Sequence, residues 1–155
     1  MTALLEVKNL RVEFPSRRGT LLALDDISFS IAPGEILGVV GESGAGKSLT
    51  GAAIIGLLEP PGRIAGGEIR LDGQRIDNLP YEAMRKIRGR QIGAIFQDPL
   101  TSLNPLYTIG RQLIETIRTH LPVSEDEART RAIKLLQETG IQAAEQRIEQ
   151  YPHQF

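Results

Sequence analysis

The fold is decided by residues 41–48, which read Gly41-Glu42-Ser43-Gly44-Ala45-Gly46-Lys47-Ser48. They follow the pattern G-x-x-x-x-G-K-[ST] of the phosphate-binding P-loop. Glycines here let the backbone wrap closely around phosphate oxygens, with successive N–H groups pointing inward. A helix that begins after the loop adds its partial positive charge. The stretch therefore predicts a nucleoside triphosphate site, in which Lys47 reaches the β- and γ-phosphates and the Ser48 hydroxyl coordinates Mg²⁺.

The segments on either side of the P-loop give it the expected setting. Residues 36–40 (I-L-G-V-V) form a short apolar run led in by the turn Pro33-Gly34, which predicts a buried parallel strand. Residues 49–58 are rich in Ala, Ile and Leu and predict a helix. The order strand, glycine loop, helix predicts an α/β fold of the P-loop NTPase type, built on a mostly parallel sheet.

An antiparallel hairpin is predicted ahead of the P-loop strand. Residues 5–14 alternate apolar and polar in two parts and predict a strand. Residues 21–31 predict a second strand, interrupted by Asp25-Asp26, and residues 16–19 form the turn between them.

The remainder of the chain alternates short strands and helices. Asp72-Gly73 is a hairpin-turn dipeptide, and Ser124 with Glu127 three residues later forms a capping box. Strands are predicted over residues 68–71 and 92–96. Helices are predicted from Pro80 to about Arg88, over residues 109–120, and from Ser124 to Thr139 with Gly140 as the C-cap.

Composition narrows the classes of function. The chain has 155 residues, 41% of them hydrophobic and 24% charged, and 18 basic against 19 acidic residues give a net charge of −1. This balance offers no electrostatic case for nucleic acid as a partner. The absence of cysteine excludes thiolate metal sites and disulfides. No stretch approaches the 18 apolar residues of a membrane-spanning helix.

Three stretches in order resemble the ATP-binding subunit of ABC transporters. They are L-E-V-K-N-L at residues 5–10, A-L-D-D-I-S-F-S-I-A-P-G-E-I-L-G-V-V-G-E-S-G-A-G-K-S at residues 23–48, and I-G-A-I-F-Q-D-P at residues 92–99. Residues 96–105 and the final Tyr151-Pro152-His153-Gln154-Phe155 are similar to the oligopeptide/dipeptide (peptide/nickel) importer branch in particular. The resemblance covers nearly the whole chain and leaves the transported solute open.

The resemblance also implies roles for residues outside the P-loop. Phe14 matches the aromatic residue that stacks on adenine, although its position alone also suits a strand core residue. Gln97 matches the Q-loop glutamine, which ligates Mg²⁺ and touches the attacking water; without the resemblance it would be a polar turn residue. Leu49 stands where the family commonly has a second hydroxyl, so only its backbone N–H can serve the phosphates.

The resemblance implies partners and a place in the cell. A second ATPase subunit would join in a head-to-tail dimer, and membrane permease subunits would dock near the Q-loop and the helical segment that follows it. The expected location is the cytoplasmic face of the inner (plasma) membrane, as a peripheral subunit. The chain is expected to divide into a nucleotide-binding core over residues 1–96 and a Q-loop and helical part over residues 97–155.

Two motifs of a hydrolysing subunit are not found in the sequence. No run of four apolar residues is followed by Asp-Glu, and the signature expected after the Tyr-Pro-His-Gln-Phe segment is not present. The chain is thus expected to be incomplete relative to the family. No catalytic residue is identified, and the 155 residues alone are expected to be inactive as an ATPase.

Three other functions remain open at the level of sequence. A non-transport ABC ATPase acting on DNA or ribosomes would usually carry a basic surface. A small-molecule P-loop kinase would use Lys47 and Ser48 in the same way, without requiring the hairpin or Gln97. A non-catalytic nucleotide-binding module is compatible with the motifs that are missing.

Overall fold

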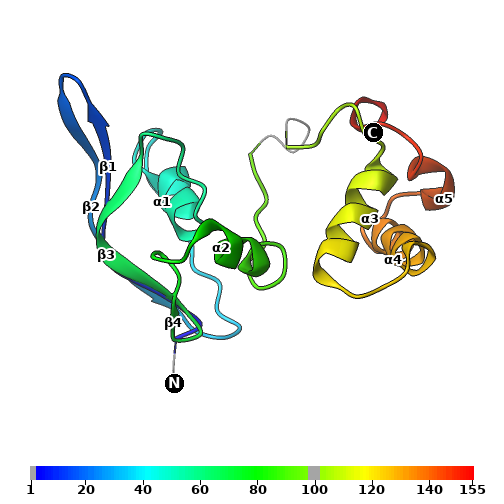
Figure 1. Cartoon of the computed structure of the whole chain (residues 1–155), viewed down its shortest axis with the longest axis horizontal. Coiled ribbons are helices and arrows are strands. Elements are labelled where there is room, and N and C mark those ends of the chain that lie inside the picture. The colour runs from blue at the N-terminus through cyan, green and yellow to red at the C-terminus, as the bar shows by residue number, and fades with distance from the viewer. Residues whose placement is uncertain (1–2, 98–101) are drawn as a thin grey trace. The chain divides into compact units, whose positions relative to one another are not determined.

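The computed structural model describes residues 3–97 and 102–155 and divides into two compact units, Met1–Arg85 and Lys86–Phe155. Figure 1 shows the elements in chain order. They are β1 (Leu5–Ser16), β2 (Gly19–Ile31), α1 (Lys47–Ile54), β3 (Arg63–Leu71), β4 (Gln74–Arg75), α2 (Tyr81–Ile87), α3 (Ile109–His120), α4 (Glu125–Glu138), α5 (Ala144–Arg147) and the 3₁₀ turn η1 (Pro152–Gln154).

The first unit is built on a four-stranded sheet with the order β2-β1-β3-β4, and every neighbouring pair is antiparallel. The predicted hairpin is confirmed, since β1 pairs with β2 from Leu5 opposite Ile31 to Ser16 opposite Gly19. In Figure 1, α1 lies beside one face of this sheet. β3 begins earlier than predicted, at Arg63, because its pairing with β1 extends to Arg63 opposite Glu13, across two shifts in register.

A β-bulge explains why the apolar pattern of β1 comes in two parts. Asn9 has φ +47° and Asp26 of β2 has φ +56°, and the Asn9 side-chain amide donates to the Asp26 carboxylate at 2.5 Å. An extra residue in a strand reverses the inside–outside alternation, so Val7 and Leu10 are both buried although they are three positions apart. Asn and Asp tolerate positive φ better than most residues, which suits them to this position.

The parallel part of the predicted sheet is not formed by the described residues. Residues 36–40 and 92–96 carry no strand, and apart from the half-buried Ile92 their residues are exposed to solvent: Ile36 is 96%, Val40 94% and Ile95 100% exposed. The one parallel pairing among the described residues is an isolated bridge between Arg88 and Ile92. A strand exists only through hydrogen bonds to a neighbour, and no described segment pairs with residues 36–40. Both strand predictions are therefore wrong for this structure.

The helix after the P-loop is shorter than predicted. α1 starts at Lys47 and ends at Ile54, four residues before the predicted end at Leu58. Gly56 has φ +65°, and Leu57 N–H donates to the Ala52 carbonyl at 2.8 Å, which closes the last turn as a Schellman motif. The predicted helix from Pro80 is confirmed as α2.

The second unit holds the helical segment, and its two long helices have the predicted bounds. Ser124 caps α4 by accepting from the Glu127 N–H at 3.2 Å, and Gly140 follows its end with φ +83°. α3 is capped by Thr108, which was not predicted. Its first two N–H groups donate to the carbonyls of Gln150 and Ile148, which anchors the segment after α4 to the start of α3.

The structure divides the chain by compactness, whereas the prediction divided it by function. The two compact units separate at Arg85/Lys86, while the division after residue 96 concerns functional parts and stays a prediction. Among the helices of residues 3–97 and 102–155, none combines the length and the apolar character needed to cross a bilayer.

Candidate functional site: a phosphate-binding loop

The P-loop joins α1 through a glycine that approaches the sheet closely. Gly46 is the N-cap of α1 and has φ +83° and ψ 3°, in the left-handed region that favours glycine. A Cβ at Gly46 would lie 2.5 Å from Leu24 Cδ2, and Leu24 is a buried residue of β2. The end of the loop therefore packs directly against β2. The close approach to Leu24 and the positive φ both favour glycine at this position.

A run of backbone N–H groups in the loop is left available. Within the described residues, the N–H groups of Gly44, Gly46, Lys47 and Ser48 have no protein acceptor. The last three belong to the start of α1, where a helix leaves its first N–H groups unpaired. Residues 41–45 are exposed to solvent. Clustered, accessible N–H donors at a helix start form a site suited to an anion.

The Lys47 side chain folds back over the loop. Its ammonium group donates to the Gly41 carbonyl at 2.7 Å and to the Glu42 carbonyl at 2.6 Å. An ammonium group has three N–H donors, so the two bonds hold the charge over the loop and leave one donor for a phosphate oxygen. Placing the cation there also offsets the partial negative charge of the two carbonyls. Lys47 thus stabilises the shape of the loop and supplies its only side-chain cation.

Two hydroxyl groups near the loop are used differently. Ser48 is exposed, and its hydroxyl has no protein partner within the part of the chain that the structure describes. The Thr50 hydroxyl donates back to the Gly46 carbonyl at 2.9 Å. Thr50 therefore does not take over the hydroxyl role that Leu49 lacks, and Ser48 remains the candidate Mg²⁺ ligand of the loop.

Phe14 lies in the same unit as the P-loop, on β1. It is half-buried and sits opposite Leu21 of β2. Phe14 is two residues from Val12, which pairs with Leu24, so by the alternation of a strand Phe14 belongs to the sheet face against which Gly46 packs. Two residues along a strand correspond to about 7 Å. The structure brings Phe14 and the loop to one face, and its stacking role stays a prediction.

Gln97 belongs to the second unit, as an exposed residue in a bend. Its neighbours Asp98 and Pro99 lie outside the described residues. Its assignment as an Mg²⁺ ligand stays a prediction, and so does the role of Leu49, whose side chain is half-buried in α1.

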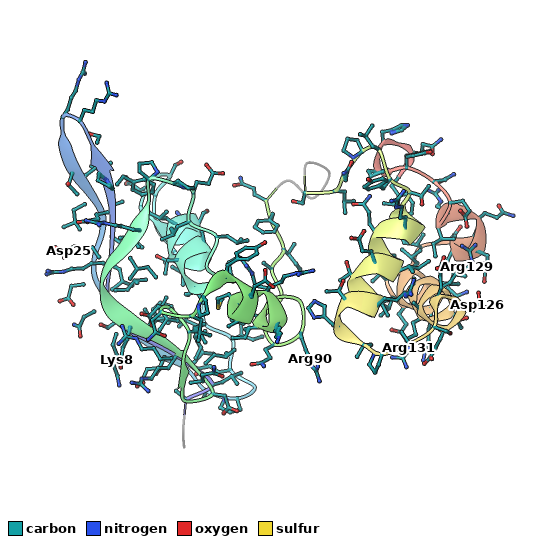
Figure 2. All side chains as sticks on the ribbon, viewed as in Figure 1. Lys8, Asp25, Arg90, Asp126, Arg129 and Arg131 are labelled. Carbon is teal, nitrogen blue, oxygen red and sulfur yellow. The ribbon has the colours of Figure 1, made fainter. Side chains whose placement is uncertain are left out.

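The outer face of the sheet carries an ion-pair network that sequence reasoning missed. Figure 2 shows Lys8 and Asp25 on the side of the sheet away from α1. On this face Arg75 binds Asp77 at 2.9 Å, and Arg70 binds Glu68 at 3.0 Å. The hydrogen bond from Arg70 holds the pKa of Glu68 below its usual range. These ion pairs join β3 to β4 and to the segment after β4, and so stabilise this edge of the sheet.

Asp77 is the most enclosed member of the network. Its carboxylate, whose side chain is 5% exposed, accepts from the buried Ile69 N–H at 2.7 Å. Burial opposes ionisation, but the hydrogen bonds from Arg75 and Ile69 outweigh it and leave the pKa of Asp77 below its ordinary value. Asp77 thereby extends the pairing of β3 beyond the short strand β4. The sequence gives only a weak signal for this interaction. A carboxylate follows Arg75 by two positions, shortly after the predicted turn at Asp72-Gly73.

Comparison with known proteins gives a consistent result. Residues 24–155 match the family model described as ABC transporter. The chain is 46% identical over 153 residues to the oligopeptide transport ATP-binding protein OppD of Escherichia coli (strain K12), covering 99% of this chain and 45% of that protein. It is 43% identical over 153 residues to the dipeptide transport ATP-binding protein DppD of Haemophilus influenzae, covering 99% of this chain and 46% of that protein.

A solved structure supports the same assignment. The chain superposes on the ATP-binding cassette MJ0796, in a dimeric post-hydrolysis state bound to ADP and Pi, with a TM-score of 0.83 and 25% identity, covering 97% of this chain and 62% of that one. The α/β class and the cassette fold are thereby confirmed. The chain spans less than half the length of the curated relatives that it matches. With the P-loop, the hairpin and the helical segment in place, this chain belongs to the ABC transporter family.

Proposed function

We propose that the chain binds ATP with Mg²⁺ through its P-loop. The observation that carries the proposal is the set of available N–H groups at Gly44, Gly46, Lys47 and Ser48, with the Lys47 ammonium bonded to the carbonyls of the same loop. Polyphosphate is the ligand that matches this arrangement, because its oxygens accept from many donors at once and its charge pairs with Lys47. The family to which the chain belongs and the names of its relatives support adenine as the base.

The remaining site residues complete the proposal. Phe14 would stack on the adenine ring, and the Ser48 hydroxyl with the Gln97 amide oxygen would hold Mg²⁺. Hydroxyl and amide oxygens are the hard ligands that this ion accepts, and Ser48 is accessible for it. A Mg²⁺ ion held there would supply positive charge that offsets the charge of the phosphates. The contribution of this chain is to bind and orient the phosphates.

We also propose that the whole protein energises a membrane importer for peptides or similar small solutes. This rests on the resemblance to OppD and DppD, whose names describe oligopeptide and dipeptide transport ATP-binding proteins. The dimeric state of MJ0796 supports a second ATPase subunit as a partner. The site of action would be the cytoplasmic face of the membrane. ATP hydrolysis is proposed for the whole protein, as part of this role.

In this proposal the permease subunits would dock on the second unit. A groove of about 740 Å³ runs along α3 and the start of α4. The residues that line it include the apolar Ile114, Leu121 and Val123 and two ion pairs, Arg118–Glu125 and Arg129–Glu149. A lining that combines apolar side chains with charged ones is compatible with a protein-binding surface. Figure 2 labels Arg129 on α4.

Titration of a fluorescent ATP analogue in the presence of Mg²⁺ tests the nucleotide site. Lys47→Ala is expected to weaken binding by about tenfold or more, since it removes a charge worth about 1.5–3 kcal/mol in hydrogen bonds to charged groups. The matched control is Lys86→Ala, which removes an exposed lysine outside the loop. Equal affinities of the wild-type chain and Lys47→Ala for the ATP analogue would refute the proposal that ATP binds at the P-loop.

A further inference from the structure

The edge of the Phe14 ring rests on the backbone of Gly62. A Cβ built at Gly62 would lie 2.7 Å from Phe14 Cε1 and 2.9 Å from Phe14 Cζ. It would also lie 2.8 Å from the Glu59 carbonyl oxygen. Real side-chain carbons do not approach other atoms this closely, so no residue larger than glycine fits without movement of the ring or of the turn. The ring and the glycine are far apart in sequence and meet because β3 pairs with β1.

The turn that carries Gly62 is fixed from both sides. Gly62 N–H donates to the Glu59 carbonyl at 2.8 Å, which closes the turn just before β3. The next residue, Arg63, pairs with Glu13 at 2.6 Å, and Glu13 is the neighbour of Phe14 on β1. Gly62 is not in the left-handed region, so what the position demands is space and not unusual backbone angles. The turn therefore limits, by steric contact, how far the edge of the Phe14 ring can move.

We infer that Gly62 is a positioning residue for the aromatic platform of the nucleotide site. This inference rests on the proposed stacking of adenine on Phe14. Stacking depends on the plane of the ring, and a ring whose Cε1 and Cζ edge rests on fixed backbone is held in one plane before the base arrives. Such preorganisation lowers the cost of ordering the side chain on binding. A methyl group at Gly62 displaces the edge and tilts the face that the base would meet.

The test is a double-mutant cycle on ATP affinity, measured by calorimetry with Mg²⁺ for the wild-type chain, Gly62→Ala, Phe14→Ala and the double variant. Gly62→Ala is expected to weaken ATP binding about fivefold or more when Phe14 is present. In the Phe14→Ala background the same change is expected to alter affinity less than about twofold, because no ring remains to be displaced. The matched control is Gly66→Ala on β3, which begins directly after Gly62; an added Cβ there meets only the Arg11 side chain at ordinary contact distance, 3.5 Å.

The outcomes separate the two proposals. An equal loss in both backgrounds, or no loss with Phe14 present, would overturn the role of Gly62 while leaving the nucleotide site intact. Failure of the wild-type chain to bind ATP would instead overturn the proposed function. If Gly62→Ala does not fold, the melting temperatures of the four proteins show whether its defect depends on the Phe14 ring. Recovery of folding in the double variant supports the contact with the ring, and no recovery assigns the cost to the Glu59 carbonyl and overturns the inference.

Discussion

At the scale of single residues, Lys47 and Thr50 show what a motif predicts and what it leaves out. The pattern places a lysine and a hydroxyl at fixed positions; in the structure the Lys47 ammonium bonds to two carbonyls of the loop, and its contact with phosphate stays a prediction. The pattern says nothing of Thr50, whose hydroxyl is taken by the Gly46 carbonyl. Spacing in the sequence predicts contacts within one loop, because residues so few positions apart stay close together in space.

Contacts between distant residues were beyond sequence reasoning. Gly62 and Phe14 meet through the pairing of β1 with β3, which extends further toward the hairpin turn than the Gly-rich sequence of β3 suggested. Leu24 meets Gly46 through the seating of the loop on β2. In both cases the register of the sheet decides the contact, and register depends on bulges that composition does not reveal.

The stacking role of Phe14 is a prediction at this scale. The chain contains no tryptophan, so Phe14→Trp introduces a single reporter. We expect ATP with Mg²⁺ to quench its emission while inorganic tripolyphosphate does not, because only ATP brings a base to the ring. Tyr81→Trp, at an exposed aromatic position of α2, is the control and should not respond. Unchanged emission on saturation with ATP would assign Phe14 to the core of the strand.

At the scale of elements, the predictions succeeded where the signal was local. The hairpin, α2, α3 and α4 follow from strand alternation, from Pro80 and from the caps of α4, and all are confirmed. The two parallel strands were wrong because an apolar run predicts burial but does not supply the neighbour that a strand needs. α5 and η1 were missed because each is only one turn long.

The hydrogen bond between Asp77 and Ile69 of β3 leads to a prediction of how stability depends on pH. Because its folded pKa is lowered, ionised Asp77 contributes stability above its unfolded pKa of about 3.9, and this contribution is lost as pH falls through the lower folded value. The free energy of unfolding should therefore fall from about pH 4 downward. Asp77→Asn should show a shallower fall, which denaturant titrations at several pH values would measure.

Two further variants complete that test. Asp77→Ala leaves the buried Ile69 N–H without its acceptor and should cost about 1–3 kcal/mol at neutral pH. Asp72→Asn removes a carboxylate from the nearby turn without touching Arg75 or Ile69, and should keep the acid dependence of the wild-type chain. An unchanged slope in Asp77→Asn would show that other carboxylates govern the acid response.

At the scale of the whole molecule, the exposed apolar segments predict self-association. Residues 36–40 and 92–96 present apolar side chains and a backbone that no described strand pairs, an arrangement that favours pairing with other chains. Sedimentation velocity should show association that increases with concentration. Ile36→Lys with Val40→Lys should reduce it, whereas Leu106→Lys, at an exposed apolar residue elsewhere, should not. A wild-type chain that stays monomeric at high concentration would refute this.

The central claim is that ATP binds at the P-loop, and backbone amide NMR of the labelled chain tests it most directly. Addition of ATP with Mg²⁺ should shift the amide signals of Gly44, Gly46, Lys47 and Ser48 most strongly, because these N–H groups have no protein acceptor among the described residues and would donate to phosphate. Tripolyphosphate should reproduce these shifts, and the Lys47→Ala chain should lose them. Saturable binding whose shifts fall elsewhere, with the loop signals unmoved, would contradict the account.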